Sequence, residues 1–158
     1  MKIYTKVCFQ KLPISLETAW EFLSNPKNLA VITPADMKFT ILSGADKTIF
    51  PGQIVQYDVT PALGIKSRWI TEITHVIDGR YFVDEQRFGP YAFWHHKHFI
   101  REIPGGVEME DIIDYKLPFG ILGRLLQPVL VQPKLDAIFE YRSKKLIAIF
   151  GEYKLNAS

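Results

Sequence analysis

Hydrophobic and polar residues alternate along IYTKVCFQKL, residues 3–12, and this period of two predicts a half-buried β-strand. A helix is expected soon after it, because Ser15 is a favourable N-cap and apolar residues follow at helical spacing. The Asn25-Pro26 pair ends this helix. The next segment, KNLAVITP, predicts a second short helical turn. Two short helices are therefore expected after the first strand.

The same alternation recurs between residues 36 and 117 in short runs that are separated by turn residues. The predicted strands are residues 37–43, 53–60, 65–77, 80–87, 92–103 and 107–117. Pairs such as Pro51-Gly52 and Asp78-Gly79 stand between these runs and are typical of tight turns. Strands joined by such short turns run antiparallel, so the pattern predicts an antiparallel meander.

After Pro118 the apolar period changes to that of a helix. Phe119 to Leu126 predicts a short lead-in helix, and a long helix is expected from Pro133 to a C-cap at Gly151. The apolar stripe of the long helix consists of Leu135, Ile138, Phe139, Leu146, Ile149 and Phe150. This stripe must be buried, and the concave face of the sheet offers the place. The pattern predicts an α+β fold in which a curved antiparallel sheet wraps around a long C-terminal helix.

The composition agrees with one globular domain over residues 1–158. Hydrophobic residues make up 47% of the chain, and no linker, repeat or low-complexity tract divides it. The only cysteine, Cys8, has no partner for an internal disulfide, and the first residues lack the apolar core of a signal peptide. These features predict a cytoplasmic protein.

Charge and motifs argue against several kinds of partner. The 19 basic and 17 acidic residues are scattered along the chain, and this pattern is not typical of proteins that bind nucleic acid or an anionic membrane. The most apolar stretch, FGILGRLLQPVLVQP, is interrupted by Arg124, Gln127 and two prolines, so no membrane span is expected. P-loop, dinucleotide and nucleophile motifs are absent from the sequence, and no cofactor is expected.

Three histidines stand within four positions in GPYAFWHHKHFI, residues 89–100. Residues two apart share a face of a strand, so His96 and His98 point one way and His95 the other. The next strand has one polar face, which leaves Asp111 on its inner face. A two-residue hairpin loop would put His96 and His98 on the inner face with Asp111, whereas a three-residue loop would reverse this parity.

Three interpretations of this inward polar cluster are open. It is a hydrogen-bonded structural cluster, a ligand-contacting or catalytic cluster in a cavity, or a metal site. The metal alternative uses His96, His98 and Glu102, which with Gly89 approach the first cupin motif. We expect no metal, because the glycine spacing differs by one, no later histidine completes a second motif, and cupins lack a long C-terminal helix.

The element order and three segments resemble the START/SRPBCC superfamily over essentially the whole chain. These segments are AWEFLSNPKNLAVITP, GPYAFWHHKHF and DYKLPFGILGRL. The resemblance implies the helix-grip fold shared with the birch-pollen allergen and the bacterial polyketide cyclases, and it is closest to small stand-alone bacterial ligand-binding members. Members bind lipids, quinones, hormones or polyketides between sheet and helix, and a minority are cyclases or dehydratases. Some relatives are fused to epimerase-like domains.

The leading hypothesis is a non-catalytic protein that binds a hydrophobic or amphipathic small molecule, such as a lipid, a quinone or a polyketide-like compound, between the sheet and the long helix. The expected ligand contacts are Trp69, Phe82, Gln86, Tyr91, Trp94, His96, His98, Asp111, Tyr115 and Phe139. Aromatic residues at this spacing are more often core, and Gln86 or Tyr91 would alternatively stabilise the Gly89-Pro90 turn.

Two further functions are possible from the resemblance. The first is a polyketide cyclase or dehydratase in which His96, His98 or Asp111 moves protons. The second is an interaction module for an epimerase-like protein partner, which an exposed apolar patch would favour.

Overall fold

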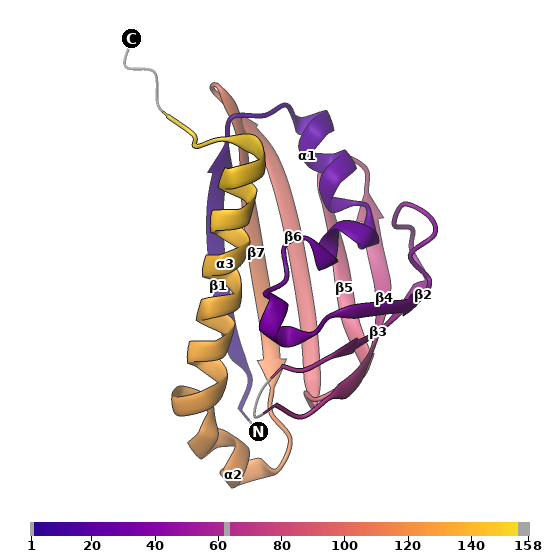
Figure 1. Ribbon diagram of the computed structural model, residues 1–158, viewed down its shortest axis with the longest axis vertical. Helices are drawn as coiled ribbons and strands as arrows, with labels where there is room; N and C mark the ends of the chain where they lie inside the picture. Colours follow the sequence, from indigo (N-terminus) through magenta and orange to yellow (C-terminus); the bar gives the residue numbers. More distant parts are fainter. Residues whose placement is uncertain (1, 62–63, 155–158) are drawn as a thin grey trace.

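The computed structural model describes residues 2–61 and 64–154, which form one antiparallel sheet with helices packed on one of its faces (Figure 1). The sheet has seven strands in the order β1-β7-β6-β5-β4-β3-β2. Their bounds are β1 Tyr4–Leu12, β2 Thr40–Ser43, β3 Gln53–Val59, β4 Ser67–Ile77, β5 Tyr81–Phe88, β6 Phe93–Ile103 and β7 Gly106–Lys116. Every strand that the alternation predicts is therefore present.

Strand β2 begins three residues later than the sequence pattern predicts. Residues Ala35–Met37 instead form a short 3-10 helix, η2. Lys38 follows with left-handed backbone angles and a φ of 47°. An extended strand does not pass through such a residue, so β2 starts only after the chain has changed direction.

The turn between β6 and β7 fixes which side chains face inward. It consists of Pro104 and Gly105, and Ile103 lies opposite Gly106. Gly105 has a φ of 79°, which the second central residue of a type II turn requires. A two-residue turn sets even positions of β6 beside odd positions of β7, as predicted.

The helices are α1 Leu16–Leu23, η1 Pro26–Ala30, η2, α2 Gly120–Leu126, η3 Gln127–Val131 and α3 Gln132–Phe150. Ser15 caps α1 as predicted, because its hydroxyl accepts a hydrogen bond of 3.1 Å from the Thr18 amide. The last three helical segments follow one another without a break, so the chain is helical from Gly120 to Phe150. None of the helices among the described residues is long and apolar enough to cross a membrane.

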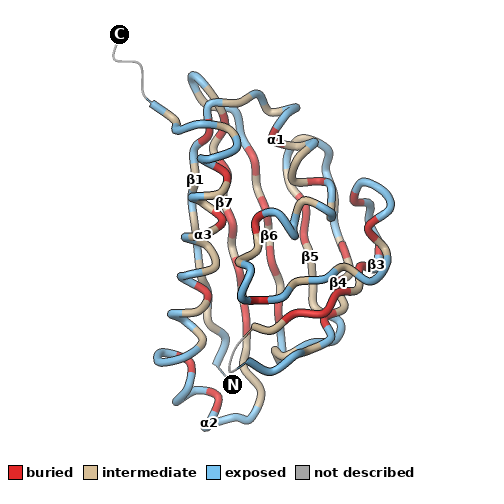
Figure 2. Tube along the Cα trace, in the orientation of Figure 1, coloured by how far each residue is buried: buried red, intermediate tan, exposed pale blue. Residues whose placement is uncertain are grey.

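The helices divide one face of the sheet between them. Helix α3 lies over β1 and β7, α1 packs against β6 and β7, and η1 contacts β2 (Figure 1). The predicted α3 stripe is buried at Leu135 and Leu146, and Phe150 packs against the core, but Ile149 is exposed. Buried and less buried positions alternate along β6 and β7, as expected for a sheet with one covered face (Figure 2).

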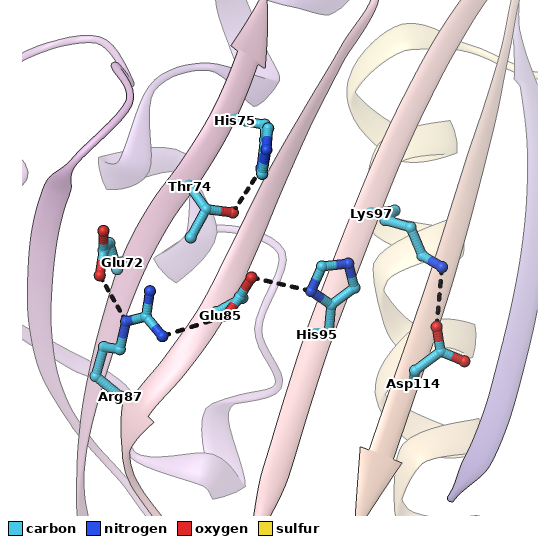
Figure 3. A network of polar contacts seen from close by, with 8 residues as sticks. All are labelled: Glu72, Thr74, His75, Glu85, Arg87, His95, Lys97 and Asp114. Carbon is cyan, nitrogen blue, oxygen red and sulfur yellow. Dashed lines mark hydrogen bonds and ion pairs between the residues drawn. The ribbon is translucent and has the colours of Figure 1, made fainter.

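The opposite face of the sheet carries polar side chains that pair across strands (Figure 3). His95 lies here, and its Nδ1 is 3.1 Å from Glu85 Oε1. Lys97 donates a hydrogen bond of 2.9 Å to Asp114 on the neighbouring strand. His95 therefore belongs to the outer surface, whereas the other two histidines of β6 point toward the helices.

Candidate functional site

A cavity of about 220 Å³ lies between the sheet, α3 and the segment that contains η1 and η2. Its walls are mostly apolar, and its aromatic members are Phe22, Phe39, Tyr57, Phe82, Tyr91, Phe139 and the two tryptophans Trp69 and Trp94. Lys134 of α3 also lines the cavity, and its Nζ lies 2.6 Å from Asp36 Oδ2 on η2. This ion pair joins α3 to η2 at the rim of the cavity.

Three polar side chains of the cavity, Asp84, His96 and His98, meet on the neighbouring strands β5 and β6. The β5–β6 register sets Asp84 opposite His96 and Phe82 opposite His98. His98 Nε2 lies 2.8 Å from Asp84 Oδ2, and its Nδ1 lies 2.7 Å from Asp111 Oδ1. His96 Nε2 lies 3.1 Å from Asp111 Oδ1, and its Nδ1 lies 3.5 Å from Asp84 Oδ2. Each imidazole therefore spans the two carboxylates.

These contacts differ in quality as hydrogen bonds. The bonds from His98 to Asp84 and from His96 to Asp111 have good geometry. The short contact between His98 Nδ1 and Asp111 is outside hydrogen-bond geometry, and that nitrogen has no other partner among the described residues. Asp84 is thus the principal partner of His98, and Asp111 is the principal partner of His96.

Aromatic contacts fix the planes of the two imidazoles. The His98 ring stacks on Phe82 with centroids 4.1 Å apart and an interplanar angle of 15°. The His96 ring lies 3.7 Å from the His98 ring, and its far side meets the edge of Phe139 at 6.0 Å. Packing of this kind restrains side-chain rotation, so the cluster keeps one orientation toward the cavity.

Arg142 of α3 supplies a cation beneath the histidines. Its guanidinium lies 3.3 Å from Asp111 Oδ1, and both side chains are buried. With Asp84 and Asp111 ionised, one imidazolium beside this guanidinium makes the total charge of the cluster zero. Buried charges are tolerated when they are paired in this way.

The environment moves the pKa values of the two histidines in opposite directions. Burial and the neighbouring His98 lower the pKa of His96. Burial also opposes the charged form of His98, but its contacts with Asp111 and Asp84 outweigh this and raise its pKa. His98 is therefore the imidazolium of the cluster, and His96 is the neutral imidazole.

Both carboxyl groups are held in their ionised form. Burial opposes ionisation of Asp111, but Arg142 and the two histidines lower its pKa well below the usual range. Burial likewise opposes ionisation of Asp84, whose hydrogen bond from His98 lowers its pKa. Asp84 is the carboxylate that lines the cavity, whereas Asp111 lies behind the histidines. A bound molecule would therefore meet Asp84 and the two imidazoles first.

The structure brings most of the predicted contact residues to the cavity wall. Those that line it are Trp69, Phe82, Tyr91, Trp94, His96, His98 and Phe139. Gln86, Asp111 and Tyr115 do not line it. The side-chain amide of Gln86 instead stabilises the turn. It donates a hydrogen bond of 2.6 Å to the Tyr91 carbonyl oxygen and accepts one of 3.2 Å from the Tyr91 backbone amide. Tyr115 stacks on Tyr4, and its hydroxyl accepts a hydrogen bond of 2.9 Å from Gln127.

Two residues that matter in the cluster are not among the sequence predictions. Asp84 is two positions after Phe82 in β5, so strand parity already places both on one face. Arg142 lies four positions after Ile138 and four before Leu146, on the apolar stripe of α3. The available signal was strand parity for Asp84, and for Arg142 it was a charge within an apolar helical stripe.

Glu102 does not join the histidines, contrary to the metal alternative. It lies four residues beyond His98 on β6, roughly 13 Å along a strand, and its side chain is exposed. Asp84 takes its place: donor atoms of Asp84, His96 and His98 lie within 4.8 Å of one another. Two imidazoles and one carboxylate are a donor set that suits divalent transition metals, although here the same atoms already bond to one another.

Comparisons with known proteins give the fold. No family model matches this chain, and no curated protein sequence matches it. Among solved structures, protein Ms6760 from Mycobacterium smegmatis is 16% identical with a TM-score of 0.66, over 94% of this chain and 96% of that one. Protein CV1439 from Chromobacterium violaceum is 13% identical with a TM-score of 0.71, over 94% and 98%.

A plant protein has the same architecture. Major latex-like protein 151 from Panax ginseng is 12% identical with a TM-score of 0.68, over 94% of this chain and 97% of that one. Together with the sheet order and the long terminal helix, these similarities show the helix-grip fold. The fold expected from the sequence is confirmed.

Proposed function

We propose that this helix-grip chain binds a compact amphipathic molecule in the cavity, with the polar group of the ligand at Asp84, His96 and His98. The observation that supports this proposal is the asymmetry of the cavity. Its walls are mostly aromatic and aliphatic, and apart from Lys134, which is paired with Asp36, its charged groups are gathered at Asp84, the two histidines and Arg142. Apolar walls with a few convergent polar groups are typical of small-molecule sites.

The volume favours a small ligand. The cavity volume is about 220 Å³. This is below the range of about 300–1,000 Å³ that is usual for drug-sized ligands. A one- or two-ring molecule suits it better than a long-chain lipid. Among lipids, quinones and polyketide-like compounds, we therefore favour a quinone or a small polyketide-like ring.

The polar groups of the cavity indicate which functional groups such a ligand carries. Asp84 is an acceptor and suits a ligand hydroxyl. Trp69 Nε1 is a buried donor that has no hydrogen-bond partner among the described residues. A ligand carbonyl would satisfy this donor and offset the cost of its burial. A hydroxylated ring ketone carries both groups.

Isothermal titration with 7-hydroxy-1-tetralone, a two-ring ketone whose phenolic hydroxyl stays protonated at neutral pH, tests the proposal. We expect saturable one-to-one binding, which an Ile138→Trp variant loses because the larger side chain fills the cavity. Ile147→Trp on an exposed position of the same helix is the control and should bind normally. Asp84→Asn should weaken binding by about tenfold or more, because a hydrogen bond to a charged acceptor is lost. Equal binding by the two tryptophan variants would place the site elsewhere and refute the proposal.

A second function is supported by the pairing of His98 with Asp84 at the cavity wall. An imidazolium within hydrogen-bond distance of a bound carbonyl would act as a general acid, as a cyclase or dehydratase requires. In this alternative we expect the protein to convert a poly-carbonyl compound. Loss of turnover with retained binding in a His98→Gln variant would support it, and absence of turnover in the unmodified protein would contradict it.

A further inference from the structure

The helical segment that leads into α3 exposes its large apolar side chains and buries small or polar residues. Phe119, Ile121, Leu125 and Val129 are exposed to 80%, 67%, 65% and 68%. Leu122, Leu126 and Leu130 are also exposed. The buried members of this segment are Gly123 and Gln127. A helix on a globular protein normally buries its large apolar residues and exposes its polar ones, so this orientation is the reverse of the usual one.

Specific contacts hold the segment in this orientation. A Cβ at Gly123 would lie 2.1 Å from the Pro118 carbonyl oxygen, so only glycine permits this close approach. The Gln127 amide donates hydrogen bonds to the Tyr115 hydroxyl at 2.9 Å and to Gln132 Oε1 at 3.2 Å. The inner side of the segment is thus fitted to small and polar groups, and the leucines point outward as a consequence of this fit.

Phe119 at the start of the segment is strained as well as exposed. Its φ of 64° is in the left-handed region, which is unfavourable for a residue other than glycine, asparagine or aspartate. Because the Phe119 side chain is largely exposed, its packing does not offset the energetic cost of this backbone conformation. Strain of this kind is maintained most often where the side chain has a function.

The unpaired charges that flank the segment, among the described residues, are positive. Residues 115–135 contain Lys116, Arg124 and Lys134 and no acidic residue, and the adjoining Asp114 and Asp136 are each paired with a lysine. Lys134 pairs with Asp36, whereas Lys116 and Arg124 take part in no ion pair among the described residues. Tyr4 lies opposite Tyr115 in the sheet, so Lys2 also lies close to the start of the segment. Exposed apolar side chains are therefore interspersed with free cations.

We propose that residues 117–130 dock on an anionic lipid surface, with Phe119 and the exposed leucines in the acyl region and Arg124 at the headgroups. The segment lies at one end of the molecule, beyond the end of the sheet, where a flat surface can reach it (Figure 1). Apolar residues flanked by cations are typical of helices that lie in a membrane interface. A second copy fits less well, because a symmetric contact would bring like charges together.

The cations are not visible as a group in the sequence, since charge is scattered along the chain as a whole. The fold gathers Lys2 and Lys116 beside α2 by pairing β1 with β7. The same helical run continues into Val131 and Lys134, which line the cavity. Docking would therefore bring one side of the cavity near the lipid, but the docking itself does not depend on what the cavity binds.

Co-sedimentation with vesicles tests the proposal. We expect the protein to bind vesicles of phosphatidylglycerol and phosphatidylcholine more strongly than vesicles of phosphatidylcholine alone. An I121S/L125S variant should lose about tenfold or more in partitioning, because two large side chains no longer insert. Arg124→Gln should lose about fivefold on anionic vesicles only. The control is Phe9→Ser, an exposed apolar residue on the outer face of β1, which should bind as the unmodified protein does.

Two results would overturn the proposal. The first is absence of binding to either kind of vesicle, or an equal loss in the Phe9→Ser control. The second is a dimer in sedimentation equilibrium that I121S/L125S dissolves while no vesicle binding occurs, since the surface would then belong to a second copy. All substituted positions are exposed, and thermal unfolding confirms that each variant is folded.

Discussion

Arg142 and Asp111 connect the terminal helix to the sheet directly beneath the cavity. The guanidinium of Arg142 lies 3.3 Å from Asp111 Oδ1, and both side chains are buried. This contact lowers the pKa of Asp111 against the effect of burial and so keeps a carboxylate behind the two histidines. The position of α3 and the charge of the site therefore depend on the same pair.

Removing Arg142 alone should be strongly destabilising. An Arg142→Leu variant leaves Asp111 buried without its cation, and we expect a loss of about 3–5 kcal/mol in the free energy of unfolding, measured in urea. Replacing both residues with leucine should restore much of this loss, since no uncompensated charge is then buried. The control is Lys144→Ala, which breaks an exposed ion pair with Glu140 and should cause no measurable change.

The two histidines should give opposite dependences of stability on pH. The pKa of His98 is raised above its value of 6.5 in the unfolded chain, so its contribution is complete below that pH and is lost as pH rises through the folded pKa. The pKa of His96 is lowered from 6.5, so stability falls as pH decreases below that value and the unfolded chain takes up a proton.

Unfolding free energies of the variants at several pH values separate these contributions. His98→Gln should lose the decrease on the alkaline side and keep the decrease on the acid side. His96→Gln should do the reverse. The lowered pKa values of Asp84 and Asp111 add a further loss of stability at more acid pH, as each carboxylate is protonated in the folded protein. Identical pH profiles for the two histidine variants would contradict the assignment.

Phe119 should be replaceable with a gain in stability. Phe119→Asn keeps the left-handed backbone with less strain and loses little burial, so we expect a gain of up to about 1 kcal/mol in the free energy of unfolding. The same change should weaken vesicle binding. Phe88→Asn is the matched control, because Phe88 is also exposed but lies in extended β5 with no positive φ, and it should give no gain.

Gln86 should stabilise the turn before β6 and should not contact the ligand. Gln86→Ala removes the hydrogen bonds to both backbone groups of Tyr91, and we expect a loss of about 1–3 kcal/mol in the free energy of unfolding. At a temperature where the variant remains folded, its affinity for 7-hydroxy-1-tetralone should stay close to that of the unmodified protein. A large loss of affinity in the folded variant would return Gln86 to the list of ligand contacts.

The sequence predicts the fold well, because the signals for it are local. Alternation in seven runs gives the strands. The turn at Pro104 to Gly106 left two loop lengths open, and the two-residue turn of the structure sets the parity of His96, His98 and Asp111. Contacts across the sheet are harder to predict. The pairing of Asp84 with His98 needs the β5–β6 register, and that register depends on strand offsets which the loop residues alone do not determine.

The type of a residue also gives a wrong expectation where the three-dimensional packing places the side chain elsewhere. Tyr115 is aromatic and faces inward, but the cavity does not extend over β7 that far, so it packs on Tyr4 instead. The leucines of α2 are assigned to the interior by any hydrophobic pattern. Their exposure follows from the close approach at Gly123, which is a property of three-dimensional packing.

The ion pair of Lys134 and Asp36 at the rim of the cavity is partly exposed to solvent, whereas the cluster of Asp84, His96 and His98 is largely buried. The two side chains join α3 to η2 at a distance of 2.6 Å, and Asp36 is largely exposed to solvent. Ions in solution screen an exposed pair far more than a buried one. Added salt should therefore speed both entry and escape of a guest molecule, while the buried cluster keeps the equilibrium affinity nearly constant. The residence time would then depend on ionic strength, and the affinity on pH.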